Sequence, residues 1–316
     1  MYNDENNTYR YSRGDDSLPR DDYQPRQPAQ EPAQPQYSYQ QGSYEAPRYS
    51  YTYQIRCDVT NKAGTVQSRT ATLTVGTALP NYTYSGGHEL IDDGNGNWRL
   101  KLTSSGTLRF TNRGTGSSGI DVFCVGGGGS GAYSRGGGTG GGGGGYTTTA
   151  KGKAIANNTG YWVDVGAGGA GNHSGTRNGY DGGTSQISAL GVSAGGGKAG
   201  TTGNGGRGGN GGSGGGANDA KGGSDGSDGH YDWTDPSYVG IGQHTTTREF
   251  AESGATLYAG GGAGDGANNA GASDGGGGGA DQAGTNGLGG GGGGSYWGSN
   301  CAGAGGSGIV IIRNKR

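Results

Sequence analysis

The sequence predicts a mainly β protein in which an antiparallel β-sandwich is interrupted by a glycine-rich helix bundle and preceded by a disordered tail. Three observations support this fold class. Short apolar segments alternate with turn residues, as is typical of strands. The chain contains 82 glycines among 316 residues, and all but twelve of them follow Gly119. The first fifty residues are polar and hold six of the eight prolines.

Residues 1–50 form the predicted tail, which is rich in Tyr, Gln and Pro. Such a composition buries too little apolar surface to offset the conformational entropy lost on folding, so we expect disorder. No apolar run of signal-peptide length follows Met1, and no stretch reaches the roughly 18 apolar residues of a membrane span. We therefore expect neither classical secretion nor membrane insertion.

Residues 51–78 are predicted to form a partial domain that consists of one β-hairpin. Two alternating segments, 53–60 and 65–75, flank the turn Asn61-Lys62-Ala63-Gly64. Because a lone hairpin is marginally stable in water, three interpretations stay open. The segment is a remnant, the product of an incomplete gene model, or a piece that docks on its neighbour.

The third predicted domain, residues 79–316, begins with a meander of short strands. Leu100, Leu102, Leu108 and Phe110 alternate with charged residues, which predicts one buried and one solvated face. Two apolar segments on either side of the glycines are predicted to be central strands of one sheet. A sandwich of the jelly-roll or TNF-like kind, whose strands open into glycine excursions, accounts for this pattern. The expected strands are 82–84, 88–92, 98–103, 107–111, 120–125 and 309–313.

The glycine region, residues 126–308, fits neither collagen nor a plain linker. It has one proline, Pro236, and irregular glycine spacing, which excludes a collagen helix. Strand-like pieces interrupt it, which a flexible linker does not need. A bundle of polyglycine-II helices fits better, because their outward-pointing backbone groups can bond neighbouring helices. A solvated coil is the alternative. The strand-like pieces are 146–150, 160–165, 186–192, 245–250 and 256–259.

Several of these segments carry a family resemblance. The sequence Val125-Gly126-Gly127-Gly128-Gly129 after an apolar strand, together with the closing Gly-Ser-Gly-Ile-Val-Ile-Ile-Arg of residues 306–313, resembles the glycine-rich domain of bacteriophage tail and tail-fibre proteins. The Tyr-Gln-Ile-Arg-Cys sequence that ends at Cys57 resembles a bacterial or phage immunoglobulin-like domain. The resemblance implies a structural or receptor-binding role in a virion tail or at a cell surface, with other tail proteins as partners.

Motifs for catalysis, cofactors and metals are not indicated. The G-x-S-x-G and G-x-G-x-x-G matches lack the strand-turn-helix context that such sites need, and composition explains them. The four histidines and three cysteines do not stand at metal-ligand spacing. A net charge of −2 gives no general attraction to nucleic acid. We therefore expect a protein that is not an enzyme, with no cofactor, no metal and no nucleic-acid partner.

Aromatic insertions in the glycine region are the candidate binding residues: Tyr231, Trp233, Tyr238, Tyr296 and Trp297. Rings stack on sugars and apolar patches while their polar edges form hydrogen bonds, and recognition residues concentrate on loops. The expected ligand is a host cell-surface glycan or protein, and the expected function is that of a tail adhesin. Two alternatives stay open: the rings cover the bundle, or the protein is a glycine-rich spacer without a ligand. A homo-oligomer is also left open.

Overall fold

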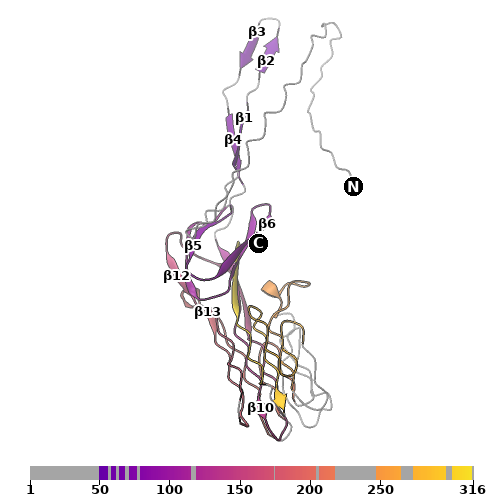
Figure 1. The fold of residues 1–316 in the computed structure, drawn as a ribbon. Coiled ribbons are helices and arrows are strands. Elements are labelled where there is room, and N and C mark those ends of the chain that lie inside the picture. The colour runs from indigo at the N-terminus through magenta and orange to yellow at the C-terminus, as the bar shows by residue number, and fades with distance from the viewer. Residues whose placement is uncertain are drawn as a thin grey trace, which may run out of the picture. The chain divides into compact units, whose positions relative to one another are not determined.

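The computed structural model describes residues 50–55, 58–61, 64–67, 71–76, 79–114, 119–173, 175–203, 206–217, 247–264, 273–296 and 301–314 (Figure 1). Within these ranges the chain is mainly β, with several antiparallel sheets, as predicted. Apart from Ser50, the predicted disordered tail, residues 1–50, lies outside the described residues.

The described residues within 51–78 form two antiparallel strand pairs. Strand β1 (Ser50–Ile55) pairs antiparallel with β4 (Ala71–Gly76), and β2 (Asp58–Asn61) pairs antiparallel with β3 (Gly64–Gln67). Asn61 lies opposite Gly64, so the chain reverses at the predicted turn. The domain boundary at residue 78 stays a prediction.

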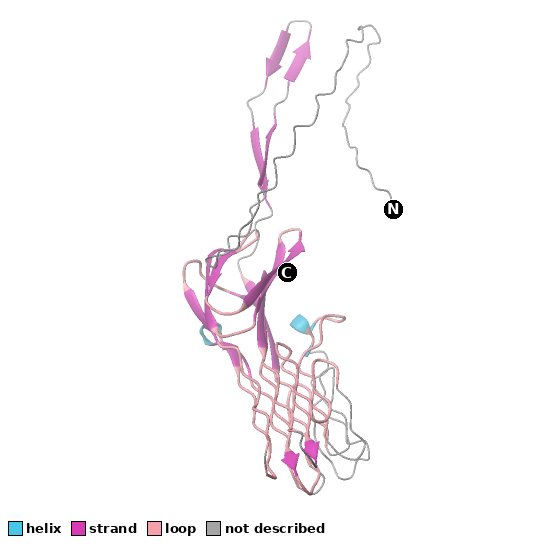
Figure 2. Ribbon diagram, in the orientation of Figure 1, coloured by secondary structure: helices cyan, strands magenta, loops and turns pink. Residues whose placement is uncertain are grey.

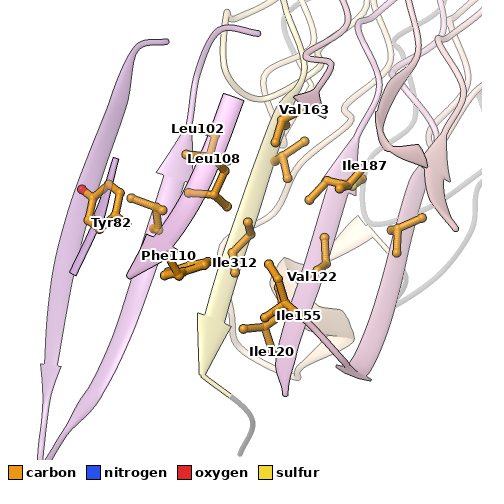
Figure 3. Packing of buried hydrophobic residues seen from close by; sticks show 14 of the residues in the cluster. Tyr82, Leu102, Leu108, Phe110, Ile120, Val122, Ile155, Val163, Ile187 and Ile312 are labelled. Atoms are coloured by element: carbon orange, nitrogen blue, oxygen red, sulfur yellow. The ribbon is translucent and has the colours of Figure 1, made fainter. Parts of the chain in front are cut away.

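Two antiparallel sheets share one hydrophobic core (Figure 3). The larger sheet has the strand order β11-β9-β16-β7-β6, and the smaller has the order β12-β8-β5. Leu100 and Ile312 from the larger sheet pack in one cluster with Leu108 and Val163 from the smaller. The strands are β5 (Asn81–Tyr84), β6 (His88–Gly94), β7 (Asn97–Leu102), β8 (Gly106–Asn112), β9 (Ile120–Val125), β11 (Thr147–Lys153), β12 (Gly160–Val163) and β16 (Ile309–Asn314).

The predicted meander is wrong. Its strands are present, but they do not all pair with the next strand along the chain. Strand β5 pairs with β8, whereas β6 pairs with β7, so the chain changes sheet twice between residues 84 and 106. Gly86 and Gly106 lie at the two crossings, where the backbones come so close that a side chain at Gly86 would overlap the carbonyl oxygens of Ser104 and Ser105. The sequence showed turns at these places but not that each turn leads to another sheet.

Strands β9 and β16 are adjacent central strands, as the sequence predicts. Every residue of both strands is buried, and Ile309 lies opposite Val125. One face of the pair joins the shared core, and the other packs against a second cluster that includes Phe250 and Tyr258. Cys124 lies on the shared-core face, and burial raises the pKa of its thiol to about 12.

Three other expected strands take different forms. Within 186–192, strand β13 (Ser185–Ile187) ends at a 3₁₀ turn, Ser188–Leu190, and β14 (Val192–Ala194) follows. Gly191 allows this reversal because its φ of 63° lies in the left-handed region. The strands expected at 245–250 and 256–259 are wrong where the chain is described: residues Glu249–Ala251 form a 3₁₀ turn, and one isolated bridge joins Arg248 to Leu257.

The glycine region forms a lattice of extended segments joined by backbone hydrogen bonds (Figures 1 and 2). In segment 126–133, every third N–H group donates to the same neighbour, so three neighbours, 140–146, 177–183 and 303–306, are bonded in turn. The donor and acceptor pairs of the three series are Gly126 to Tyr146, Gly129 to Gly143 and Ala132 to Gly140; Gly127 to Gly183, Ser130 to Tyr180 and Tyr133 to Arg177; Gly128 to Gly306 and Gly131 to Gly303.

The carbonyl groups of the same segment bond three further neighbours. Segment 197–200 donates to residues 127 and 130, segment 292–295 donates to residues 129 and 132, and Gly169 donates to Gly128. Segment 126–133 is therefore surrounded on six sides. Segment 140–146 repeats the pattern, with N–H groups bonded in turn to 195–201, 213–216 and 289–292. A three-residue period with backbone donors and acceptors in all directions satisfies groups that a side-chain-poor coil leaves to water.

Close approach between segments leaves no room for side chains at many glycines of the lattice interior. A Cβ atom built on Gly142 would overlap the carbonyl oxygen of Gly129, and one built on Gly145 would overlap that of Gly126. Peripheral segments carry side chains at outward positions of the three-residue repeat. Examples of such exposed residues are Ala167, Ala170, Lys198, Arg207 and Asn210. The spacing that looked irregular in the sequence therefore follows from each segment's place in the lattice.

The lattice account predicts unequal effects for two glycine-to-alanine variants. Gly142→Ala places a methyl group against the Gly129 carbonyl and should lower the free energy of unfolding by about 2–4 kcal/mol. Gly136→Ala is the matched control, because Gly136 is exposed and nothing lies near its added Cβ. It should change stability by less than about 0.5 kcal/mol. Urea unfolding measures both, and equal effects would contradict a close-packed lattice.

Candidate functional site

The candidate aromatic residues are mostly outside the described part of the chain. Tyr231, Trp233, Tyr238 and Trp297 lie outside the described residues. Tyr296 ends strand β15 (Ser295–Tyr296), which pairs in parallel with β10 (Tyr133–Ser134). Tyr296 is half-buried, and its strand lies at the end of the lattice away from the two sheets (Figure 2).

This lattice end is built from backbone bonds between segments that are distant in sequence. Tyr133 is buried and exchanges two backbone hydrogen bonds, of 2.9 and 2.8 Å, with Arg177. Asn172 bridges Ala302, and the Asn178 carboxamide oxygen accepts the backbone N–H of Thr202 at 2.9 Å. The exposed residues here include Arg135, His173 and Arg177. The lattice end thus offers a polar surface on a framework that is held by backbone hydrogen bonds.

Sequence reasoning missed the two large aromatic residues that are exposed in the described ranges. Trp162 of β12 is 53% exposed, and Tyr180 of the lattice segment 177–183 is 50% exposed. Trp162 could have been found from the alternation in β12, which places Gly160, Trp162 and Asp164 on the same side as the strand continues. Trp162 lies within a strand, whereas the predicted binding residues all lie in aromatic insertions between glycine tracts.

A charged groove of about 430 Å³ is the other candidate site, and no sequence motif predicted it. Arg99 of β7 forms a forked pair with Asp93, with distances from 2.9 to 3.1 Å, and its Nη1 lies 2.6 Å from Glu249 Oε1. Arg313 of β16 lies 3.2 Å from Asp121 Oδ2 through its Nε. Its Nη2 lies 2.6 Å from Glu252 Oε1. Asp93 belongs to the β6–β7 hairpin and Asp121 to the central strand β9. Glu249 and Glu252 belong to the loop 247–256.

The loop 247–256 is held over the groove in an uncommon conformation. Phe250 and Ala251 both have positive φ angles, of 54° and 57°, which are unfavourable for residues with a side chain. Packing compensates for this strain. The Phe250 ring is buried against Phe123, and the Arg313 guanidinium lies 4.0 Å from its centroid. Surrounding contacts therefore determine the loop conformation.

Each of the two arginines at the groove is paired with two carboxylates. Hydrogen bonds with Asp93 and Glu249 raise the pKa of Arg99, although partial burial acts in the opposite direction. Burial and the adjacent charge of Glu249 raise the pKa of the Tyr258 hydroxyl, which donates to Glu249 Oε2 at 3.0 Å. Both arginines are thus paired with carboxylates. The arrangement clamps the loop to the larger sheet, and within the described ranges no group of three or more His, Cys, Asp or Glu residues could hold a metal ion.

Comparison with known proteins assigns the family. A family model described as "Glycine-rich domain" matches residues 102–315, which is about two thirds of the chain. The chain belongs to the glycine-rich domain family. The matched part runs from the last residue of β7 through the lattice to the end of β16, so the glycine-rich domain includes both central strands.

A search of curated proteins gave no match to the chain. Within the described part of the glycine-rich domain and the residues before it, no helix has the length and apolarity of a membrane span.

The clamp predicts that two carboxylates on the same arginine contribute unequally to the stability of the glycine-rich domain. Asp121 is fully buried and also accepts the Gly152 N–H, so Asp121→Asn leaves the buried Arg313 charge poorly compensated. It should cost about 3–5 kcal/mol of unfolding free energy. Glu252 is about half exposed, so Glu252→Gln should cost at most about 1 kcal/mol. Urea unfolding measures the free energy of unfolding of both variants. Equal losses of stability would contradict the claim that burial makes Asp121 the more important partner of Arg313.

Proposed function

We propose that the chain is a non-enzymatic phage tail or tail-fibre protein that recognises a host surface through loops displayed on a glycine-rich bundle. The observation that carries this proposal is the six-neighbour hydrogen bonding of segment 126–133. It supports a rigid scaffold whose interior has few side chains and whose recognition chemistry therefore lies on its loops and outer face. Other tail proteins are the proposed structural partners, in a virion tail or at a cell surface.

The bundle is proposed to consist of polyglycine-II helices. Such helices have about three residues per turn and no internal hydrogen bonds, so consecutive residues bond different neighbours. The three-residue bonding period supports this assignment. Positive φ angles in the described glycines occur at turns such as Gly175, Gly191 and Gly203, not within 126–131 or 140–145, which fits a single helix hand. The two sheets with one shared core support the proposed β-sandwich of the jelly-roll or TNF-like kind.

Recognition is proposed to lie in loops that interrupt the glycine segments. The inserts that contain Trp233 and Trp297 combine large rings with hydrogen-bonding groups, which suits a glycan or a protein surface. Tyr296 lies at the lattice end, next to the second of these inserts in sequence. A rigid framework under such loops limits the entropy lost on binding. The immunoglobulin-like resemblance of the hairpin adds a module that is compatible with a tail protein.

A spacer without a ligand is the second candidate. The backbone hydrogen bonds within the lattice favour the spacer function. A framework whose polar groups bond one another can act mechanically without a ligand. The half-buried position of Tyr296 also agrees with a ring that covers the bundle. The two functions differ in one respect that can be measured, which is binding to a cell envelope.

The double variant Trp233→Ala, Trp297→Ala tests the adhesin function. If both rings contact the receptor, binding to a panel of bacterial envelope preparations should fall at least about tenfold, as for interface residues that dominate affinity. Sedimentation of the labelled full-length chain with the envelopes measures this binding. The control is the amide-exchange pattern of the lattice, which should match the unsubstituted chain. Unchanged binding would reject these residues, and no binding by either chain would favour the spacer.

A further inference from the structure

The solvent-facing side of the smaller sheet carries an unusual set of side chains. Strand β12 presents Trp162 outward, and the register places Thr107 of β8 directly opposite it. Arg109 lies two residues further along β8, opposite Gly160. Alternation in β8 leaves Thr107 and Arg109 exposed while Leu108 is buried in the shared core. The exposed Trp162 ring on β12 is therefore flanked by the Thr107 hydroxyl and the Arg109 guanidinium on the neighbouring strand β8.

The Trp162 side chain is fixed by hydrogen bonds even though it is 53% exposed. Its indole N–H donates to Asp164 Oδ1 at 2.6 Å, and the Gln186 carboxamide N–H donates to Asp164 Oδ2 at 2.9 Å. The backbones of Asp164 and Gln186 exchange two hydrogen bonds of 2.9 Å. Asp164 thus orients the Trp162 ring, and Gln186 of strand β13 in turn holds Asp164. A pre-oriented ring loses little rotamer freedom when a ligand binds.

The neighbouring groups keep unused hydrogen-bonding capacity. Gln186 retains its carbonyl oxygen and one N–H, and each carboxylate oxygen of Asp164 can accept a further bond. Arg109 has no hydrogen bond, ion pair or ring contact of its side chain among the described residues. Gly160, two residues before Trp162 on the same face, has no side chain to cover the ring. The platform therefore combines one apolar ring face with donors and acceptors on both sides.

We propose that this face, made by Trp162, Asp164, Gln186, Thr107 and Arg109, binds a saccharide whose sugar ring stacks on the indole. The C–H face of a pyranose is apolar, and its hydroxyls both donate and accept, which matches a carboxylate, a carboxamide, a threonine hydroxyl and a guanidinium around one ring. A protein partner would need a larger apolar area. Nucleic acid would need more cations than Arg109 and would be repelled by Asp164.

This inference rests on the proposed function, because it names a saccharide as the class of surface ligand. It places the contact on the smaller sheet, however, and not on the loops that contain Trp233 and Trp297. The two assignments can therefore fail separately. Loss of envelope binding in the double variant concerns the loops, whereas the platform is tested with isolated glycans and a different ring.

A glycan array of neutral and acidic bacterial polysaccharide fragments, probed with the labelled full-length chain, tests the platform. Trp162→Ala should lower the affinity for the bound glycans at least about 30-fold, as expected when a dominant contact ring is lost. The matched control is Tyr180→Ala, which removes a ring of similar exposure from the lattice flank. It should leave the affinity within about twofold. Arg109→Ala, which breaks no described side-chain contact, should weaken binding severalfold.

Three results would overturn the proposal. The unsubstituted chain could bind no glycan on the array, Trp162→Ala could bind as well as the unsubstituted chain, or Tyr180→Ala could lose binding equally. If Trp162→Ala has a lower melting temperature than the unsubstituted chain, Arg109→Ala decides instead. Full affinity in Arg109→Ala would then also overturn the proposal. Binding lost with Trp162 but kept in the Trp233, Trp297 double variant would support the platform and reject the loops.

Discussion

The structure depends on one constraint: in the glycine region, backbone groups must bond other segments, because few side chains are present to do so. Segment 126–133 meets this constraint with six neighbours. Each ordered residue loses about 1–2 kcal/mol of conformational entropy, while one hydrogen bond contributes about 0.5–1.5 kcal/mol net. The bonds alone therefore do not stabilise the lattice by a wide margin. Apolar packing next to the lattice must supply the remainder.

The central strands provide that support. Strand β9 leads into the first lattice segment and β16 follows the last, and the register brings Ile309 opposite Val125. The two ends of the whole glycine excursion are thus pinned side by side within the larger sheet. Phe250 and Tyr258 extend the packing from this sheet to the loop 247–256. Arg313, whose buried partner is Asp121, also contacts Glu252 and the Phe250 ring of the same loop. Lattice order and sheet order are therefore coupled through a few buried residues.

Local patterns made part of this architecture predictable. The apolar segments 120–125 and 309–313 and the turn at Asn61–Gly64 were found from alternation and turn residues. The crossings at Gly86 and Gly106 were not found, because a turn does not reveal which sheet receives the next strand. The outward positions of Lys198 and Arg207 were hidden for a related reason: whether a lattice residue needs to be glycine depends on its neighbours in space. Trp162 was missed because its role depends on Asp164 and on Gln186 of another strand.

Amide hydrogen exchange across residues 126–145 and 289–308 tests the central claim most directly. If six neighbours bond each interior segment, the N–H groups of residues 126–131 and 140–145 should exchange orders of magnitude more slowly than in an unstructured peptide of the same sequence. Exposed glycines such as Gly136 should be less protected than the interior. Exchange of the interior glycines at the unprotected rate would contradict the lattice and would remove the scaffold on which the proposed recognition loops depend.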